Sequence, residues 1–395
     1  MPVLRPARAC FSISTSERPN VKRQLRLFAA IVALALALVP LANLVYQGPA
    51  RLFAPLSDGP VADTLKQRFY NFDFALTAAS RALYPLGISI DPDQVVIGRD
   101  GWLYLGDKHG LTMTAHRAGL RHGDTARATA IATAQLRWDE WLRDRGVAVF
   151  RVMIGPDKHS VHDDGLPGWA AGRKPPKVQS LHGGPAGHLY VDLGPSLRQA
   201  ADAGDSSLYY RTDTHWNALG AAYAFGGLTE ALRTADATLA WPVTAEIQLA
   251  RIDPRKGGDL ARFLRLEMEL QDHEPVVAQP RTAHIDVTVE EFLTGKRISG
   301  PGNPLLDSPK TPLLVRSPSA LNKRKVLWLR DSFGTALSPY LALTFSDVLQ
   351  VHYSDALKDG GAPLAELVQR WQPEIVLVTV VERSALLKIF ETPPP

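Results

Sequence analysis

The first apolar stretch of the chain is long enough to cross a membrane. Residues 27–46 are twenty consecutive residues without a charge, and about 20 apolar residues in a helix span the ~30 Å hydrocarbon core of a bilayer. Residues 1–26 carry six Lys or Arg and one Glu, which by the positive-inside rule keeps the N-terminus in the cytoplasm and sends the rest outward. We therefore expect a basic cytoplasmic tail at 1–26 and an uncleaved transmembrane signal-anchor at 27–46.

A cleaved signal peptide is the alternative for the same residues. The apolar run is long for the hydrophobic region of a signal peptide. Pro40 also stands where a small residue would be needed if cleavage followed Ala42. The sequence therefore favours the anchor.

Beyond the apolar stretch, the pattern changes to shorter elements. A Pro- and Gly-rich connector at 47–60 leads to apolar and aromatic positions that predict a helix over 61–84. Residues 95–105 hold two β-rich runs on either side of Asp100 and Gly101. An Asp-Gly pair between such runs is the strongest short signal of a β-hairpin.

Helices and apolar strands alternate along the rest of the chain. A long helix is expected from Asp124, as its N-cap, to Arg145, and residues 165–188 are expected to form a loop. Residues from about 240 to 323 mix short strands with Pro-rich joints and are either a separate lobe or an insertion. Buried strands are expected at 147–154, 325–329, 348–353 and 375–381, and further helices at 217–233 and 364–371. The alternation predicts an α/β fold with a mainly parallel sheet and helices on both faces.

Charge and cysteine content narrow the classes of function. The whole chain has a formal net charge of +4 and residues 1–26 contribute +5, which leaves −1 for the remainder. Because a nucleic-acid groove needs basic residues on the folded domain, nucleic acid is not expected as a partner. The only cysteine, Cys10, precedes the apolar stretch, so we expect neither disulfides nor thiol chemistry in the exported part.

Two short segments contain the parts of an acyl-transferring triad. Asp213 and His215 are two residues apart, and in an extended segment such side chains point to the same side. Ser332 follows the strand expected at 325–329, and ligands of open α/β sheets bind at the carboxyl ends of strands. Serine needs a base, which a neutral histidine oriented by a carboxylate supplies. The two segments together indicate catalysis.

Helix capping is the alternative for each of these residues alone. Asp213 and Asn217 could cap the helix expected at 217–233, and Ser332 could cap a helix after its strand. The α/β-hydrolase fold is disfavoured, because its nucleophile elbow has Gly two residues before the serine, where this chain has Arg330. The combination of all three triad residues favours catalysis over capping.

Other polar residues give weaker signals. His159 and His162, followed by two aspartates, lack the helical context and partner ligand of a metal site, so neither a metal nor a cofactor is expected. Lys158 follows a strand and is either a surface lysine or a residue of the site. Glu382 and Arg383 end the last strand and form either a local ion pair or contacts to substrate.

The motifs together resemble a known family. D-x-H-W at 213–216, D-S-F at 331–333 and residues 100–105 resemble the AlgJ/AlgX-type alginate O-acetyltransferases and the related DHHW proteins, which are SGNH-hydrolase-like. The resemblance covers most of residues 90–385, including Gly258-Asp259-Leu260. It implies an SGNH-hydrolase-like sheet with permuted motif order, because the Asp/His block here precedes the serine block.

The resemblance also implies roles for individual residues. Ser332 would be the nucleophile, His215 the base and Asp213 its orienting acid. SGNH enzymes have G-D-S where this chain has Arg330 before the aspartate, so the oxyanion donors are expected to be the backbone N–H of Ser332 or Phe333. The remaining candidates for contact with substrate are Lys158, Arg330 and Glu382.

The activity implied is that of a polysaccharide O-acetyltransferase in the inner membrane. The connector and helix at 47–89 would lead to a periplasmic catalytic domain at 90–395. Acetyl would come from a membrane-bound O-acyltransferase, because acetyl-CoA is not available outside the cytoplasm, and the acceptor would be an exported glycan. Two alternatives stay open: a carbohydrate acetylesterase with the same triad, and a non-catalytic glycan-binding subunit of a secretion complex.

Overall fold

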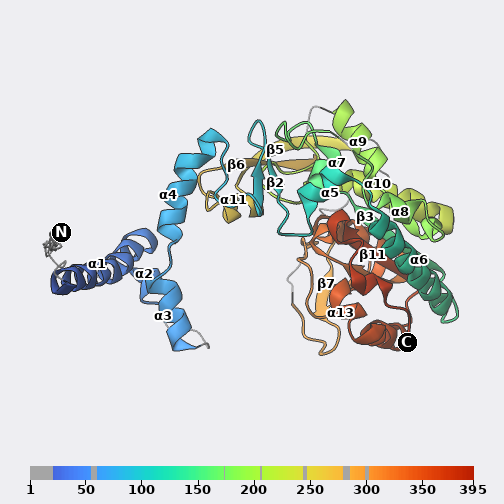
Figure 1. Cartoon of the computed structure of the whole chain (residues 1–395). Coiled ribbons are helices and arrows are strands. Elements are labelled where there is room, and N and C mark those ends of the chain that lie inside the picture. Colours follow the sequence, from blue (N-terminus) through green and yellow to red (C-terminus); the bar gives the residue numbers. More distant parts are fainter. Residues whose placement is uncertain are drawn as a thin grey trace, which may run out of the picture. The chain divides into compact units, whose positions relative to one another are not determined.

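The computed structural model describes residues 21–54, 60–172, 174–204, 207–242, 247–278, 285–298 and 302–395. The chain divides into two compact units, residues 1–79 and 80–395. Figure 1 shows the elements of each unit in chain order, and each unit is treated by itself below.

The first unit contains the long apolar helix α1, Val21–Gln47, which is followed by α2, Pro49–Leu52, and α3, Val61–Phe69. Helix α1 is long and apolar enough to cross a membrane, with a mean hydropathy of 2.5 over an 18-residue window. Its Asn43 amide is buried and donates to the carbonyl oxygens of Phe69, at 3.0 Å, and Asn71, at 2.9 Å. The C-terminal end of α1 is thereby fixed to the end of α3.

The helix expected over 61–84 is broken into α3 and α4, Asp73–Leu83. Asn71 explains the break, because its side-chain oxygen accepts the N–H of Asp73 at 3.1 Å and starts a new helix there. A smaller difference concerns Asp124. Helix α6 begins at His122, so Asp124 is its third residue and accepts the N–H of Arg121 at 3.1 Å in a capping box, in place of being the N-cap.

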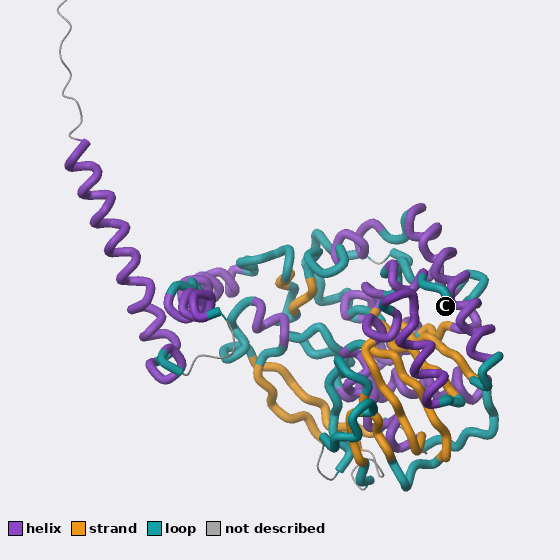
Figure 2. Tube along the Cα trace, turned by 90° about the horizontal axis from the view of Figure 1, so that it is seen from below, coloured by secondary structure: helices purple, strands orange, loops and turns teal. Residues whose placement is uncertain are grey.

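The second unit is built on one seven-stranded sheet, in which five neighbouring strands are parallel and two antiparallel strands extend one edge. The strand order is β4 (Tyr190–Asp192), β3 (Val149–Gly155), β11 (Ile375–Val381), β9 (Asn322–Arg330), β10 (Phe345–His352), β8 (Leu313–Arg316) and β7 (Thr288–Glu291). Figure 2 shows these strands side by side. The mainly parallel sheet predicted from the apolar runs is confirmed.

Helices cover both faces of the sheet, as expected. Side chains alternate along a strand, so Val326 and Trp328 of β9 pack into one core cluster while Leu327 and Leu329 pack into another. The first cluster is covered by α9 (Gly194–Ala203), α10 (Ala218–Ala235) and α12 (Ser338–Thr344), and the second by α6 (His122–Arg143), α8 (Gln179–His182), α13 (Tyr353–Leu357) and α14 (Ala362–Trp371).

Two small hairpins lie outside the main sheet. Strands β1 (Val95–Ile97) and β2 (Leu103–Leu105) pair as predicted, and both Asp100 and Gly101 have the positive φ that their turn requires. The segment whose organisation the sequence left open contributes β7 and β8 to the sheet edge. It also forms a separate antiparallel pair, β5 (Gln248–Lys256) and β6 (Gln271–Ala278), joined through the short helix α11 (Asp259–Phe263).

Candidate active site

Ser332 lies at the carboxyl end of the central strand β9, on a turn fixed by the residue before it. Asp331 accepts the backbone N–H of Phe333 at 2.9 Å and that of Val381, the last residue of β11, at 2.8 Å. Its own N–H donates to the carbonyl oxygen of Thr379 at 3.2 Å. These bonds hold the turn against β11 and leave Ser332 exposed at the edge of the sheet.

Asp213, His215 and Ser332 form a continuous chain of hydrogen bonds. His215 Nε2 lies 2.8 Å from Ser332 Oγ, and His215 Nδ1 lies 2.7 Å from Asp213 Oδ1. The backbone N–H of His215 donates to the same Oδ1 at 3.2 Å, which closes the turn between the two residues. The three residues that the motifs singled out are therefore brought together with the spacing that proton transfer from a serine needs.

The charges of the site favour an ionised aspartate next to the histidine. Burial alone would raise the pKa of Asp213, but the hydrogen bond and charge of His215, together with Arg255, hold it well below its usual range. Burial alone would lower the pKa of His215, but the hydrogen bond and charge of Asp213, with a smaller effect of Asp259, raise it above its ordinary value. His215 is therefore a stronger base than a free imidazole.

Trp216 connects the two segments of the site. Its indole N–H donates to the carbonyl oxygen of Phe333 at 3.1 Å, and the ring of Phe333 lies 4.8 Å from that of Trp216 and 5.3 Å from that of His215. Asn217 caps helix α10 by accepting the N–H groups of Leu219 and Gly220. Capping is thus the role of Asn217, whereas Asp213 and Ser332 bond to His215.

The β5–α11–β6 hairpin fixes the loop that carries Asp213 and His215. Asp272 of β6 accepts the backbone N–H of Thr212 at 2.7 Å, and Asp259 of α11 accepts that of Thr214 at 2.7 Å. Sequence reasoning missed Asp272. Asp259 occurred only in the Gly-Asp-Leu motif of the resemblance, without a role, because neither residue is near the loop in the sequence.

The other sequence candidates take several different positions. Phe333 donates its N–H to Asp331, whereas the N–H of Ser332 has no hydrogen bond within the part of the chain that the structure describes. Arg330 is fully buried and donates to Gln350 Oε1 at 2.7 Å and to three backbone carbonyl oxygens, so it contacts protein and not the solvent side of the site. Lys158 is buried under the loop, with its Nζ on backbone oxygens.

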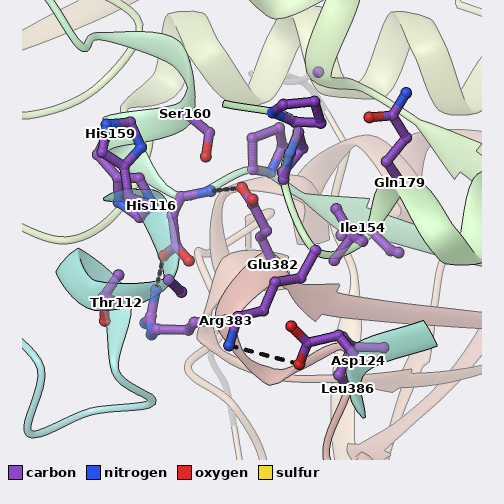
Figure 3. A pocket seen from close by; sticks show the side chains of 18 of the residues that line it. Thr112, His116, Asp124, Ile154, His159, Ser160, Gln179, Glu382, Arg383 and Leu386 are labelled. Atoms are coloured by element: carbon purple, nitrogen blue, oxygen red, sulfur yellow. Dashed lines mark hydrogen bonds and ion pairs between the residues drawn. The ribbon is translucent and has the colours of Figure 1, made fainter. Parts of the chain in front are cut away.

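Glu382 lies on the wall of a cavity of about 690 Å³ at the carboxyl ends of β3 and β11. Its Oε2 accepts the N–H of Asp157 at 2.9 Å, and Arg383 forms an ion pair with the Asp157 carboxylate (Figure 3). Burial, with the charge of Asp157, raises the pKa of Glu382 to about 7. The cavity is lined from both sides of the sheet, by Asp124 and Arg127 of α6 and by Pro195 and Arg198 of α9.

One group of three potential metal ligands occurs among the residues described: Asp213, His215 and Asp259, whose ligand atoms lie within 4.8 Å of one another. The same atoms take part in the hydrogen bonds given above. His159 and His162 are not part of this group. The Nε2 of His162 accepts the N–H of Leu208 at 3.3 Å.

The fold agrees with that of known structures. The structure is similar to Bacillus cereus PatB1, with a TM-score of 0.53, 14% identity, and coverage of 75% of this chain and 99% of PatB1; PatB1 has also been solved with a sulfonyl adduct. It is similar to a DHHW family protein from Eubacterium siraeum, with a TM-score of 0.53, 16% identity, and coverage of 78% and 96%. At a lower TM-score of 0.44, it is similar to the O-acetyltransferase domain of Pseudomonas putida AlgJ, with 18% identity over 74% of this chain and 92% of that domain.

No curated protein sequence matches the chain. Residues 95–312, more than half of the chain, match the family described as the SGNH hydrolase-like domain of the acetyltransferase AlgX. The chain therefore belongs to this AlgX-type, SGNH-hydrolase-like family of acetyltransferase domains.

Proposed function

We propose that this protein is a polysaccharide O-acetyltransferase that works through an acetyl ester on Ser332. The observation that carries the proposal is the unbroken pair of hydrogen bonds on the His215 ring, 2.7 Å to Asp213 and 2.8 Å to Ser332. Such a pair is what activates a serine hydroxyl in acyl transfer. Family membership supports the same class of reaction.

In the first step, Ser332 Oγ attacks the carbonyl carbon of the acetyl donor and its proton passes to His215 Nε2. The tetrahedral intermediate collapses when the donor's oxygen leaves with that proton. In the second step, His215 takes the proton of a sugar hydroxyl as its oxygen attacks the acetyl ester, and the proton finally returns to Ser332 Oγ. The N–H of Ser332 is the backbone donor that remains for the oxyanion.

Location and partners belong to the same proposal. Helix α1 would anchor the protein in the inner membrane, with the site in the periplasm. A membrane-bound O-acyltransferase would supply acetyl, and an exported glycan would accept it. Glu382, on the wall of the neighbouring cavity, is the sequence candidate best placed to contact that glycan.

The test is the intact mass of the full chain after incubation with an activated acetyl ester. The wild type is expected to gain about 42 Da, the mass that one acetyl ester adds, whereas Ser332→Ala gains none. Ser319→Ala, at an exposed serine outside the site, is the matched control and is expected to react normally. A folded wild type with neither adduct nor Ser332-dependent ester turnover would rule out the catalytic role and favour a glycan-binding subunit.

A second measurement separates a transferase from an esterase. The acetyl-enzyme is offered an oligosaccharide in water, and the product is analysed by mass. Acetylated oligosaccharide supports the transferase. Release of acetate alone, across a panel of acceptors, supports the acetylesterase.

A further inference from the structure

Lys158 stands out among the charged residues of the molecule because it is buried with all its donors on main-chain oxygens. Its Nζ lies 2.9 Å from the carbonyl oxygen of Tyr210, 3.0 Å from that of Arg211 and 2.7 Å from that of Asp213. An ammonium group has three N–H donors. All three are used, so Lys158 has no donor left for a substrate.

The three carbonyl groups come from one short stretch of chain, residues 210–213. Because they converge on one nitrogen, they fix the direction of three peptide planes in the segment that ends in the triad acid. The rings of Trp102 and Tyr104 also lie near Lys158, at 5.5 and 5.4 Å from Nζ. The β1–β2 hairpin thus covers the lysine, and the lysine in turn supports the loop.

A buried ammonium group is costly, because its hydration is lost. An apolar side chain of similar size would fill the space without this penalty. It would remove a donor from all three carbonyl oxygens and leave the loop free to take other conformations, since only that of Arg211 also accepts a backbone N–H from the described residues, that of Leu103 at 2.8 Å. The cost of burying Lys158 is therefore offset by the hydrogen bonds with which its ammonium group fixes the loop.

We infer that Lys158 is a positioning residue: by holding residues 210–213 it keeps the Asp213–His215 turn in the conformation from which His215 reaches Ser332. The inference rests on the proposed function and adds a residue outside the triad to it. Lys158 acts through the loop and touches neither the acyl group nor the acceptor.

If Lys158 positions the loop, the reactivity of Ser332 should depend on the protonation of Lys158 and therefore on pH. Burial lowers the pKa of Lys158 to about 8, against the charges of Asp213, Asp259 and Asp272, which raise it. When the proton is lost, one of the three bonds to the loop is lost with it. The reactivity of Ser332 is therefore expected to decrease as the pH rises through about 8.

Folding stability should change in the opposite direction over this range. The folded pKa of Lys158 lies below the ordinary value of 10.5, so between these two values the unfolded chain binds more protons at this group, and its contribution to stability rises with pH. In the folded protein, the pKa values of three titratable neighbours of Lys158 lie outside this range. Burial lowers the pKa of His162 to about 4 and raises the pKa of Tyr104 and of Tyr210.

The test compares Lys158→Met with Lys325→Met in the full chain. Lys325 is a matched control, because its Nζ donates to one carbonyl oxygen, that of Trp371, at 3.2 Å and lies 5.8 Å from an indole ring, at the opposite end of β9 from Ser332. The probe is a sulfonyl fluoride, and the rate of Ser332 modification is followed by intact mass from pH 6 to 10. Thermal unfolding is recorded in the same buffers.

The wild type and Lys325→Met are expected to react alike, with a loss of rate above about pH 8. Lys158→Met is expected to react at least tenfold more slowly at pH 7.5, to lack the alkaline loss, and to unfold cooperatively. A folded Lys158→Met with the wild-type rate overturns the inference.

If Lys158→Met does not fold, the pH dependence of the wild-type rate and melting temperature still tests the role of Lys158. A rate that decreases above about pH 8 while the melting temperature holds or rises supports the inference, because a lysine that only stabilised the fold would not slow the reaction of a protein that is no less stable. A rate that stays level up to pH 10, or that decreases only together with the melting temperature, overturns it. A wild type whose Ser332 never reacts overturns the proposed function itself, which distinguishes the two failures.

Discussion

The guanidinium group of Arg255 lies 3.2 Å from Asp213 Oδ2, the carboxylate oxygen that His215 leaves free. The aspartate is thus held between an imidazole on one oxygen and a permanent cation on the other. Arg255 belongs to β5, and its guanidinium also lies 3.9 Å from the centre of the Tyr210 ring. The second cation reduces the negative charge that His215 experiences.

Replacing Arg255 with Gln should therefore raise the pKa of His215 further. The base must be neutral to react, so the acidic limb of the rate of Ser332 acylation is expected to move to higher pH. Arg251→Gln is the control, since Arg251 lies on the same strand and pairs with the exposed Asp253 at 2.9 Å. An acidic limb that stays in place in Arg255→Gln, measured as the rate between pH 5 and 9, would contradict this account.

Asp213→Asn should lower ester turnover by roughly 10⁴-fold, the loss known for the corresponding change in serine proteases. The amide cannot hold the His215 tautomer that presents an acceptor nitrogen to Ser332. Steady-state kinetics with an acetyl ester measures the effect, and the exposed Asp253→Asn serves as control. A loss of less than tenfold in a folded variant would reduce Asp213 to a structural residue.

Gly258→Ala tests how closely the hairpin approaches the triad. A Cβ at this position would lie 2.3 Å from the Cβ of Asp213, so Asp213 must move. We expect kcat to decrease at least tenfold while the protein stays folded. Gly226→Ala in α10, where a Cβ meets nothing within 4 Å, should keep full activity and raise stability by about 0.5–1 kcal/mol. Equal activity of the two variants would refute the close approach.

Arg330→Met should lower the free energy of unfolding by roughly 3–5 kcal/mol, because the buried acceptors around the guanidinium lose a charged donor. Arg330→Lys should not restore it, since an ammonium lacks the planar fork that reaches Gln350 and the carbonyl groups together. Arg324→Met, which breaks a more exposed pair with Glu374, should cost less than about 1 kcal/mol. Urea unfolding measures all three, and a small effect of Arg330→Met would count against its role.

The membrane anchor predicts the mass of the mature protein. Because α1 can span a bilayer, the chain purified from its native host should retain residues 1–46 and stay with the membranes in alkaline carbonate. A product that begins after residue 42 and is recovered in the soluble fraction would establish the cleaved signal peptide instead.

The sequence alone is sufficient to predict much of the sheet and the three residues of the candidate triad. Residues 375–381 form one apolar run that coincides with β11, and Asp213 and His215 are close enough in sequence for their side chains to meet. Such local signals do not depend on the rest of the fold.

The supports of the triad could not be predicted in this way. Arg255, Asp259 and Asp272 reach the loop only because β5 and β6 pair and fold over it. Lys158 was a candidate by its position after a strand, but its three acceptors lie more than fifty residues away in the chain. Long-range contacts of this kind leave no periodic pattern in a single sequence.

The bond from Val381 to Asp331 also has a consequence for the order in which the site is completed as the chain is made. Synthesis runs from the N-terminus, so β11 emerges last among the described strands. Until that strand is inserted between β3 and β9, the turn that presents Ser332 lacks the two hydrogen bonds that join Asp331 to β11. Ser332 is therefore expected to take its final position beside His215 only when the last strand has joined the sheet, so that, under the proposed function, the serine becomes reactive only once the domain is complete.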